Sequence, residues 1–254
     1  MRRTIDLNAD LGEGFGVWSL GDDDAMLRVV TSANIACGFH AGDPSIMLAT
    51  CRTAAERGVA IGAHVAYRDL AGFGRRELPV GPDELHADVV YQLGALQAVA
   101  RAAGTEVRYV KPHGALYNRI VHDERQAEAV VAAVRDAAPG LPLLGLASSA
   151  VEKAAARAGL PFLREAFVDR GYRADGTLVP RGERGDLLSD PVAVASRAVH
   201  MVLEGRVTTA TGEDLSLVVD SLCVHGDTPG AVVMAEAVRA ALARAGVALA
   251  SAAP

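Results

Sequence analysis

The sequence has 254 residues, of which 50% are hydrophobic and 22% are charged, which is the balance of an ordinary globular protein. This balance excludes disordered, collagen-like and coiled-coil proteins, and the length suits one large domain or two small ones. A formal net charge of −6 and an aromatic content of 4% provide neither a basic surface nor a stacking platform. Nucleic acid and membrane are therefore not expected as partners.

The cysteines and the N-terminus both indicate a reducing location. Cys37, Cys51 and Cys223 form no CxxC pair and are too few for a disulfide framework. The N-terminus carries two arginines but lacks the apolar segment of a signal peptide. Since no apolar run approaches the roughly 18 residues that cross a bilayer, we expect a cytoplasmic protein.

Short apolar or β-branched runs alternate with Ala-rich helical stretches along the chain, which is typical of parallel strands covered by helices. The predicted strands are Thr4–Leu7, Ala33–Ala36, Val59–Ala63, Val107–Val110, Leu143–Leu146, Phe162–Ala166 and Leu222–Val224. The predicted helices are Asp23–Val30, Pro44–Arg57, Pro82–Ala103, Asp123–Ala137, Ser149–Ala158, Pro191–Glu204 and Gly230–Ala245. The tail from Ala240 to Pro254 is expected to be a fraying helix end. No linker divides the chain, so a single domain over residues 1–254 is predicted.

Seven strand–helix units fit either a closed barrel or an open, doubly wound sheet. Polar residues follow nearly every predicted strand, whereas an open sheet gathers its ligand groups at one crevice. The pattern therefore favours an α/β fold of the distorted (β/α)7 TIM-like barrel type, with the open sheet as the alternative. Residues 207–219 are predicted to insert a β-hairpin, and residues 67–81 and 171–189 to form long loops that act as lids or partner surfaces.

The first predicted strand ends in a row of polar residues. Asp6, Asn8 and Asp10 alternate along the chain and share one face. Such a row can orient a metal ion, a water or an ammonium, or it can only satisfy the backbone of the next turn. The glycines that follow do not match GxGxxG, and GxxxxGK[ST] occurs nowhere in the sequence. A standard phosphate loop is therefore not expected.

Four histidines, His40, His64, His113 and His225, follow four different predicted strands. Because the carboxyl ends of parallel strands meet at one rim of a barrel, these imidazoles are expected to converge and to supply acid–base chemistry. If a metal ion is bound, its expected ligands are Asp10, His40, His64 and His113, although the sequence has no HxH or HxxxH pair.

Lys111 ends an apolar strand, where burial shifts its pKa and where its charge can bind phosphate but would repel a divalent metal. It joins Asp10 and the four histidines as a candidate catalytic residue. The candidate substrate- or phosphate-binding residues are Asn8, Asn34, Arg76, Asn118, Asp169 and Arg170. Asp169 and Arg170 form either a salt bridge of little energetic value or a clamp on the substrate, and the clamp is the favoured interpretation.

Four long stretches, DLNADLGEGFG, ANIACGFHAGDP, KPHGALYN and SLCVHGDTP, resemble the LamB/YcsF family, and the resemblance runs from about residue 3 to residue 246. It implies a barrel similar to the glycoside hydrolase/deacetylase superfamily. It also implies a role in ATP-dependent opening of the 5-oxoproline lactam, with ATP and Mg²⁺ as cofactors and with two partner subunits, B and C. The site residues carried over by motif are Asp6, Asn8, Asp10, Glu13, Asn34, His40, His64, Lys111, His113, Asn118, Asp169, Arg170, His225 and Asp227. One loop departs from the family's GAHPxYPD pattern, since it reads GAHVAYRD.

The resulting hypothesis is a lactam hydrolase in which Lys111, with Arg170 or Arg76, holds phosphate or the substrate carboxylate. Two of the four histidines act as the acid–base pair. Two alternatives stay open, a metal-dependent deacetylase-like hydrolase and a non-catalytic subunit that binds the substrate for its partners. Metal analysis tests the first alternative, and calorimetric titration with 5-oxoproline tests the second.

Overall fold

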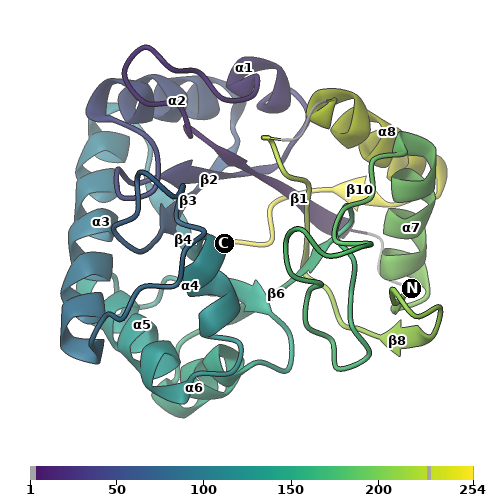
Figure 1. The fold of residues 1–254 in the computed structure, drawn as a ribbon. Helices are drawn as coiled ribbons and strands as arrows, with labels where there is room; N and C mark the ends of the chain where they lie inside the picture. Colours follow the sequence, from purple (N-terminus) through teal and green to yellow (C-terminus); the bar gives the residue numbers. More distant parts are fainter. Residues whose placement is uncertain (1–3, 228–229, 254) are drawn as a thin grey trace.

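The computed structural model describes residues 4–227 and 230–253, which form a ring of helices around a parallel barrel (Figure 1). Within the described residues, seven strands pair in the order β1-β2-β3-β4-β5-β6-β9, and the pairing of β9 with β1 closes the ring. The bounds are β1 Thr4–Leu11, β2 Ser32–Ala36, β3 Ala60–Val65, β4 Val107–Pro112, β5 Leu143–Leu146, β6 Phe162–Phe167 and β9 Ser221–Cys223. The closed barrel is thus confirmed over the open sheet.

The helices lie outside the strands, with α2 and α3 on one side of the ring and α7 and α8 on the other (Figure 1). Their bounds are α1 Asp23–Met26, α2 Pro44–Arg57, α3 Pro82–Ala102, α4 Gly114–Arg119, α5 Glu124–Ala137, α6 Ala150–Ala158, α7 Pro191–Leu203 and α8 Ala231–Arg244. None of the described helices is both long and apolar enough to cross a membrane. The predicted helices all occur, whereas the six-residue α4 was not predicted.

The C-terminal segment differs from its prediction as a fraying helix. Helix α8 ends at Arg244, and Gly246 adopts a φ of 75°, a left-handed conformation that glycine reaches without steric cost. The chain then forms β10 (Ala248–Leu249), which pairs in parallel with Thr4 and Ile5 of β1. Pro254 lies outside the described residues. The inserted hairpin is confirmed as the antiparallel pair β7 (Arg206–Thr208) and β8 (Asp214–Ser216).

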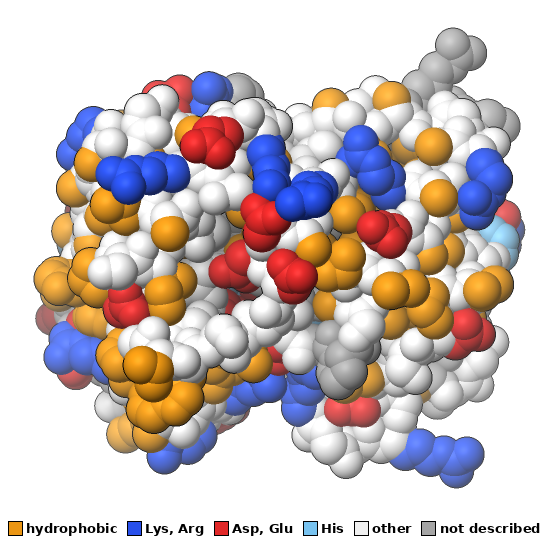
Figure 2. Space-filling view, turned by 90° about the horizontal axis from the view of Figure 1, so that it is seen from above, with side chains coloured by type: hydrophobic (Ala, Val, Ile, Leu, Met, Phe, Trp, Pro, Cys, Tyr) orange, Lys and Arg blue, Asp and Glu red, His pale blue; other side chains and the backbone are white. Residues whose placement is uncertain are grey.

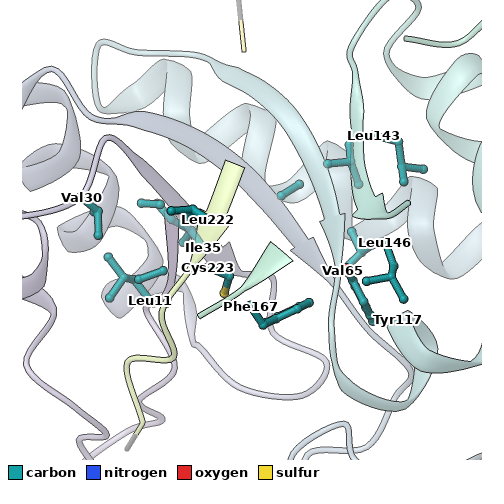
Figure 3. Packing of buried hydrophobic residues seen from close by; sticks show 14 of the residues in the cluster. Leu11, Val30, Ile35, Val65, Tyr117, Leu143, Leu146, Phe167, Leu222 and Cys223 are labelled. Atoms are coloured by element: carbon teal, nitrogen blue, oxygen red, sulfur yellow. The ribbon is translucent and has the colours of Figure 1, made fainter. Parts of the chain in front are cut away.

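Side chains alternate along each strand, so one set packs between the strands and the helices and the other set points into the barrel. Apolar residues such as Leu7 and Leu11 of β1 are buried on the helix-facing side. Figure 3 shows Phe167 beside Cys223 where β6 and β9 pair, and both of these contact Lys111 on the barrel-facing side. The interior of the barrel is instead polar. Asp6 accepts hydrogen bonds from Ser32 and Ser221 of the strands on either side of it. Asp6 and the two serines therefore have hydrogen-bond partners on neighbouring strands.

The face seen in Figure 2 carries acidic and basic side chains of both signs, interspersed with hydrophobic ones. No continuous basic area covers this face. This mixed pattern on one face agrees with the net charge of −6.

Candidate active site

A cavity of about 620 Å³ opens at the carboxyl ends of the strands and is bounded on one side by the loop after β6. Among the residues that line it are Asp10, His64, Lys111, His113 and His225. These side chains come from β1, β3, the end of β4 and the residues just after β4 and β9, so the predicted convergence at one rim occurs. His40 does not line the cavity and instead lies beside His113, fully buried.

His40, His64 and His113 form a packed group of imidazoles. The His113 ring stacks on His40 with centroids 3.8 Å apart, and its Nδ1 lies 2.9 Å from His64 Nε2. His64 Nδ1 donates to the Lys111 carbonyl at 3.0 Å, and His113 Nε2 donates to the Phe73 carbonyl at 2.9 Å. Burial holds the pKa values of His40 and His113 well below the usual range, so both rings are neutral near pH 7.

Phe73 has a φ of 55°, which is uncommon for a bulky residue and occurs here directly beside the imidazoles. Its carbonyl is the one that accepts from His113, and its ring contacts both His40 and His113 edge-on. Strained backbone of this kind gathers at functional sites, where it fixes the direction of a side chain. The unusual backbone conformation of Phe73 thus directs its carbonyl at His113 Nε2 and fixes the orientation of that ring.

Glu13 joins the imidazoles to form a group of four residues that we call the imidazole cluster: Glu13, His40, His64 and His113. Its Oε1 atom lies 3.1 Å from His40 Nε2 and 3.6 Å from His113 Nδ1. Burial, with Asp10 nearby, raises the pKa of the Glu13 carboxyl well above its usual value. Strand periodicity did not single out Glu13, because it follows the turn at Gly12 and only the family motif pointed to it.

Lys111 is buried between two carboxylates. Its Nζ lies 2.8 Å from Asp10 Oδ1, 3.0 Å from Glu165 Oε1 and 3.2 Å from Cys223 Sγ. Burial opposes its charge, but Asp10, Cys223 and Glu165 raise the pKa of Lys111 well above its usual value, so the ammonium persists. Its charge is therefore already matched inside the protein, and Glu165 is a partner that the sequence did not indicate.

Asp10 is held as a carboxylate at the centre of the site. Burial alone would raise the pKa of Asp10, but His64 and Lys111 hold it well below its usual range. Asn34 Nδ2 donates to Asp10 at 2.8 Å and to Asn8 at 2.7 Å. Asn8 and Asn34 thus lie inside the barrel and position Asp10, whereas they were expected to bind substrate.

Asp169 and His225 form a second, separate dyad. His225 Nδ1 lies 2.9 and 3.0 Å from the two Asp169 carboxylate oxygens, and the His225 amide also donates to Asp169 at 3.2 Å. Burial would raise the pKa of Asp169, but the His225 imidazole and its hydrogen bonds lower it. No ion pair joins Asp169 and Arg170 among the described residues, since Arg170 donates to the Val179 and Asp186 carbonyls, and their clamp on the substrate stays a prediction.

The remaining candidate residues lie at the mouth of the cavity or outside it. Asn118 is exposed on α4 and lines the mouth. Arg76 is not among the cavity-lining residues and pairs with Asp69. The Asp69 carboxylate also accepts a hydrogen bond from the Gly72 amide of the same loop. Asp69 thus binds both Arg76 and that amide, and the role of Arg76 in binding phosphate or substrate stays a prediction.

Arginines surround the mouth. Arg75 pairs with Asp227 at 2.5 Å, and burial lowers the pKa of Arg170 to about 10, where it is still protonated near pH 7. Arg181 also lines the cavity and forms no hydrogen bond or ion pair with the described residues. The mouth is therefore suited to an anionic ligand, whereas the deeper part holds carboxylates and imidazoles.

Comparisons with known proteins identify relatives of this chain in sequence and in fold. The model of the LamB/YcsF family matches residues 5–254. The A-subunit of 5-oxoprolinase from Mycobacterium avium (strain 104) is 64% identical over 243 residues, covering 96% of each chain. The same-named protein from Streptomyces coelicolor is 62% identical, covering 96% of this chain and 97% of its own. The crystal structure of a lactam utilization protein from Thermus thermophilus is 45% identical, with a TM-score of 0.93 over 98% of this chain and 99% of its own.

Proposed function

The chain belongs to the LamB/YcsF family, and on that premise we propose that it is the lactam-opening subunit of an ATP-dependent 5-oxoprolinase. It would take part in converting 5-oxo-L-proline to L-glutamate while ATP is cleaved to ADP and phosphate. The observation that carries the proposal is one cavity that joins the His225 imidazole, anchored by Asp169, to the Asp10 carboxylate, anchored by Lys111. Such a pair of fixed acid–base groups is what hydrolysis of an amide needs.

A five-membered lactam is a resonance-stabilised amide that water attacks slowly at neutral pH. Transfer of the γ-phosphoryl group of ATP to the lactam oxygen converts the amide into an activated imidate. Water then adds to the carbon, a proton reaches the ring nitrogen, and the C–N bond breaks to leave an acyl phosphate. A second water hydrolyses the acyl phosphate to glutamate and phosphate. The steps need a base for water and an acid for nitrogen.

We assign the proton transfers to His225. Its Nδ1 atom is held by Asp169, which fixes the tautomer and stabilises the imidazolium that forms when the ring accepts a proton. Asp10 stays ionised beside it and orients the attacking water. The substrate carboxylate is assigned to Arg181 at the mouth, in place of Lys111 and Arg76, because Lys111 is already matched by buried carboxylates and Arg76 lies outside the cavity.

Two partner subunits, B and C, are proposed to complete the enzyme. The sequence contains no phosphate loop, so we place ATP and its Mg²⁺ on a partner or where a partner meets this chain. The three cysteines are buried and unpaired, which suits a reducing cytoplasm. The isolated chain is therefore expected to show little turnover, and robust lactamase activity without partners would contradict this assignment.

The test is an assay of glutamate and ADP formation with all three subunits, and with each omitted in turn. His225→Gln should lower turnover about 10²–10⁴-fold, because the acid–base group is lost. The matched control is His200→Gln, which changes an exposed histidine on α7 and should leave turnover unchanged. Normal turnover by the His225→Gln variant would remove the proposed role.

The imidazole cluster favours one competing function, a metal-dependent hydrolase that needs no ATP. This alternative predicts 5-oxoproline hydrolysis by the chain alone, without nucleotide and lost on chelation. The 5-oxoprolinase proposal predicts that glutamate forms only when ATP and the partners are present. The same subunit-omission assay separates the two.

A further inference from the structure

We infer that the imidazole cluster, Glu13, His40, His64 and His113, binds one first-row divalent metal ion, for which Zn²⁺ is the best match. One donor atom from each residue lies within 4.8 Å of the others, and all four residues are buried. Three imidazole nitrogens and one carboxylate oxygen are a donor set that zinc prefers. The inference does not rest on the lactam chemistry, since these atoms would bind a metal whatever the substrate is.

His64 and His113 each have one ring nitrogen that donates to a backbone carbonyl and one that faces the cluster. A backbone carbonyl only accepts hydrogen bonds, so His64 Nδ1 and His113 Nε2, which contact the carbonyls of Lys111 and Phe73, must each bear a proton. The other two nitrogens, His64 Nε2 and His113 Nδ1, then face each other at 2.9 Å, and His64 Nε2 also lies 3.3 Å from Asp10 Oδ2. Both nitrogens therefore point into the cluster, where a metal ion could bind them together.

A ligand histidine usually donates its outer N–H to a carbonyl or carboxylate, which fixes the ring and aims the inner nitrogen at the metal. His64 and His113 both show this arrangement. His40 contributes a further feature, because its Nδ1 is buried without a hydrogen-bond partner among the described residues. His40 faces Glu13 through Nε2, which is its donor atom in the cluster, so Nδ1 is the outer nitrogen of this ring.

The spacing of the donor atoms is close to that of a zinc site. Ligand atoms at the usual 2.0–2.1 Å from Zn²⁺ lie about 3.3 Å from one another in a tetrahedron. The observed separations are 2.9 Å between His64 and His113, 3.1 Å between His40 and Glu13, 3.6 Å between His113 and Glu13 and 4.0 Å between His64 and Glu13, and all donor atoms lie within 4.8 Å of one another. Small side-chain rotations would therefore bring the four donors to one ion.

The charges around the cluster also favour a cation. Among the described residues, the Glu13 side chain lies within 4.0 Å of the ring nitrogens of the three histidines and within that distance of no Lys or Arg nitrogen. The sequence suggested that Lys111 would repel a metal, but the Lys111 ammonium is flanked by both Asp10 and Glu165. Asp10 was the expected carboxylate ligand, yet its Oδ1 atom is bound by Lys111 and Asn34, so Glu13 takes that place.

The experiment measures metal binding by the untagged full-length chain. The protein is stripped with a chelator, dialysed, and titrated with Zn²⁺ by calorimetry and with Co²⁺ by visible absorption. We expect one equivalent of each ion, with Co²⁺ bands far stronger than those of aqueous Co²⁺. His64→Ala and Glu13→Gln should weaken binding at least about 10-fold, and melting curves check that both variants are folded.

Two control variants locate the site. His225→Gln changes an imidazole in the same cavity that is anchored by Asp169, and His86→Ala changes one on α3 that pairs with Asp136. Both should retain full metal binding. The inference is overturned if the wild-type chain binds neither ion, or if Glu13→Gln and His64→Ala bind as tightly as it does. Because metal content is measured without turnover, failure of the lactam proposal leaves this result unaffected.

Discussion

The two sides of the cavity use the same side chain with different outer partners. In the imidazole cluster, His64 and His113 donate their outer N–H groups to backbone carbonyls, which fix the rings without adding charge. On the other side, His225 faces the Asp169 carboxylate, which stabilises a protonated ring. A neutral, fixed imidazole is a metal ligand, whereas an imidazole beside a carboxylate is a proton carrier. The outer partner therefore indicates which role each histidine has.

The buried ion-pair group of Lys111, Asp10 and Glu165 separates the two sides. The Lys111 Nζ contacts carboxylates from both β1 and β6, and Asp10 in turn lies 3.3 Å from His64. Both sides thus depend on this one ammonium for charge balance. We therefore predict that changes to Lys111 or its carboxylate partners lower the stability of the fold. Changes in the imidazole cluster should affect metal binding, and changes in the His225–Asp169 dyad should affect turnover.

The largest expected effect is that of Lys111→Met. This change leaves Asp10 and Glu165 buried without a cation, so the free energy of unfolding should fall by about 3–5 kcal/mol. The double variant Lys111→Met/Glu165→Gln removes one of the stranded charges and should recover part of that loss. Urea unfolding of the two variants and the wild type measures both effects. A Lys111→Met protein as stable as the wild type would show that the centre is not a coupled group.

Asp169→Asn tests the proton-carrying side alone. The amide keeps the size of the carboxylate but not its charge, so the His225 imidazolium loses its stabilisation and turnover should fall about 10²–10³-fold. We expect the fall mainly in kcat, with little change in KM, because no substrate-binding group is altered. Metal content should be unchanged. Loss of metal from Asp169→Asn would show that the two sides are not independent.

The sequence predicted the positions of the functional histidines better than their partners. The three strands concerned are apolar runs that a histidine follows, and a parallel barrel brings such strand ends to one rim, so the convergence of His64, His113 and His225 could be foreseen. Pairing depends on side-chain directions that adjacency does not reveal. Asp169 precedes Arg170 in the chain, yet it bonds His225, which is 56 residues away.

Other features could not be predicted from the sequence, because they depend on contacts of single residues. Asp69, seven residues before Arg76, pairs with it and turns a candidate anion-binding residue into part of the loop. Glu165 occupies a strand position whose importance depends only on Lys111 opposite it. The two-residue β10 is too short to carry a periodic pattern, and only its pairing with β1 defines it. Short elements and ion pairs across the barrel are thus the features that need coordinates.

Gly74→Ala tests the imidazole cluster through packing. Gly74 has a φ of +64°, and a Cβ there would lie 2.7 Å from His113 Cδ2 and 2.8 Å from His40 Cβ. The displaced rings should cost about 1–3 kcal/mol of stability and weaken metal binding. The matched control is Gly58→Ala, since Gly58 has a φ of +66° but nothing within 4 Å. Both variants place alanine at a positive φ, but only Gly74→Ala pushes against the imidazoles, so only it should weaken metal binding, as measured by calorimetry. Equal effects of the two variants would contradict the predicted contact with His40 and His113.

The smallest effect is expected for Asp23→Asn, behind the loop that carries Glu13. Asp23 Oδ2 accepts the Gly12 amide at 3.0 Å, and burial raises the pKa of this carboxyl to about 6. An acid whose pKa is higher in the folded state holds extra protons there, so wild-type stability should fall as pH rises from about 4 to about 6. The shift corresponds to at most about 3 kcal/mol, and partial exposure reduces it to about 1–2 kcal/mol.

The Asp23→Asn variant carries no titrating group at this position, so it should lack that pH dependence and exceed the wild type in stability at neutral pH. Urea midpoints between about pH 4 and pH 7 measure the difference, which should widen as the pH rises. Asp83→Asn, at an exposed residue in the first turn of α3, is the control and should retain the fall in stability that Asp23 causes. A parallel profile for Asp23→Asn and the wild type would mean that the carboxyl is solvated. In that case the loop on the cluster side would be more open than its packing around Gly12 indicates.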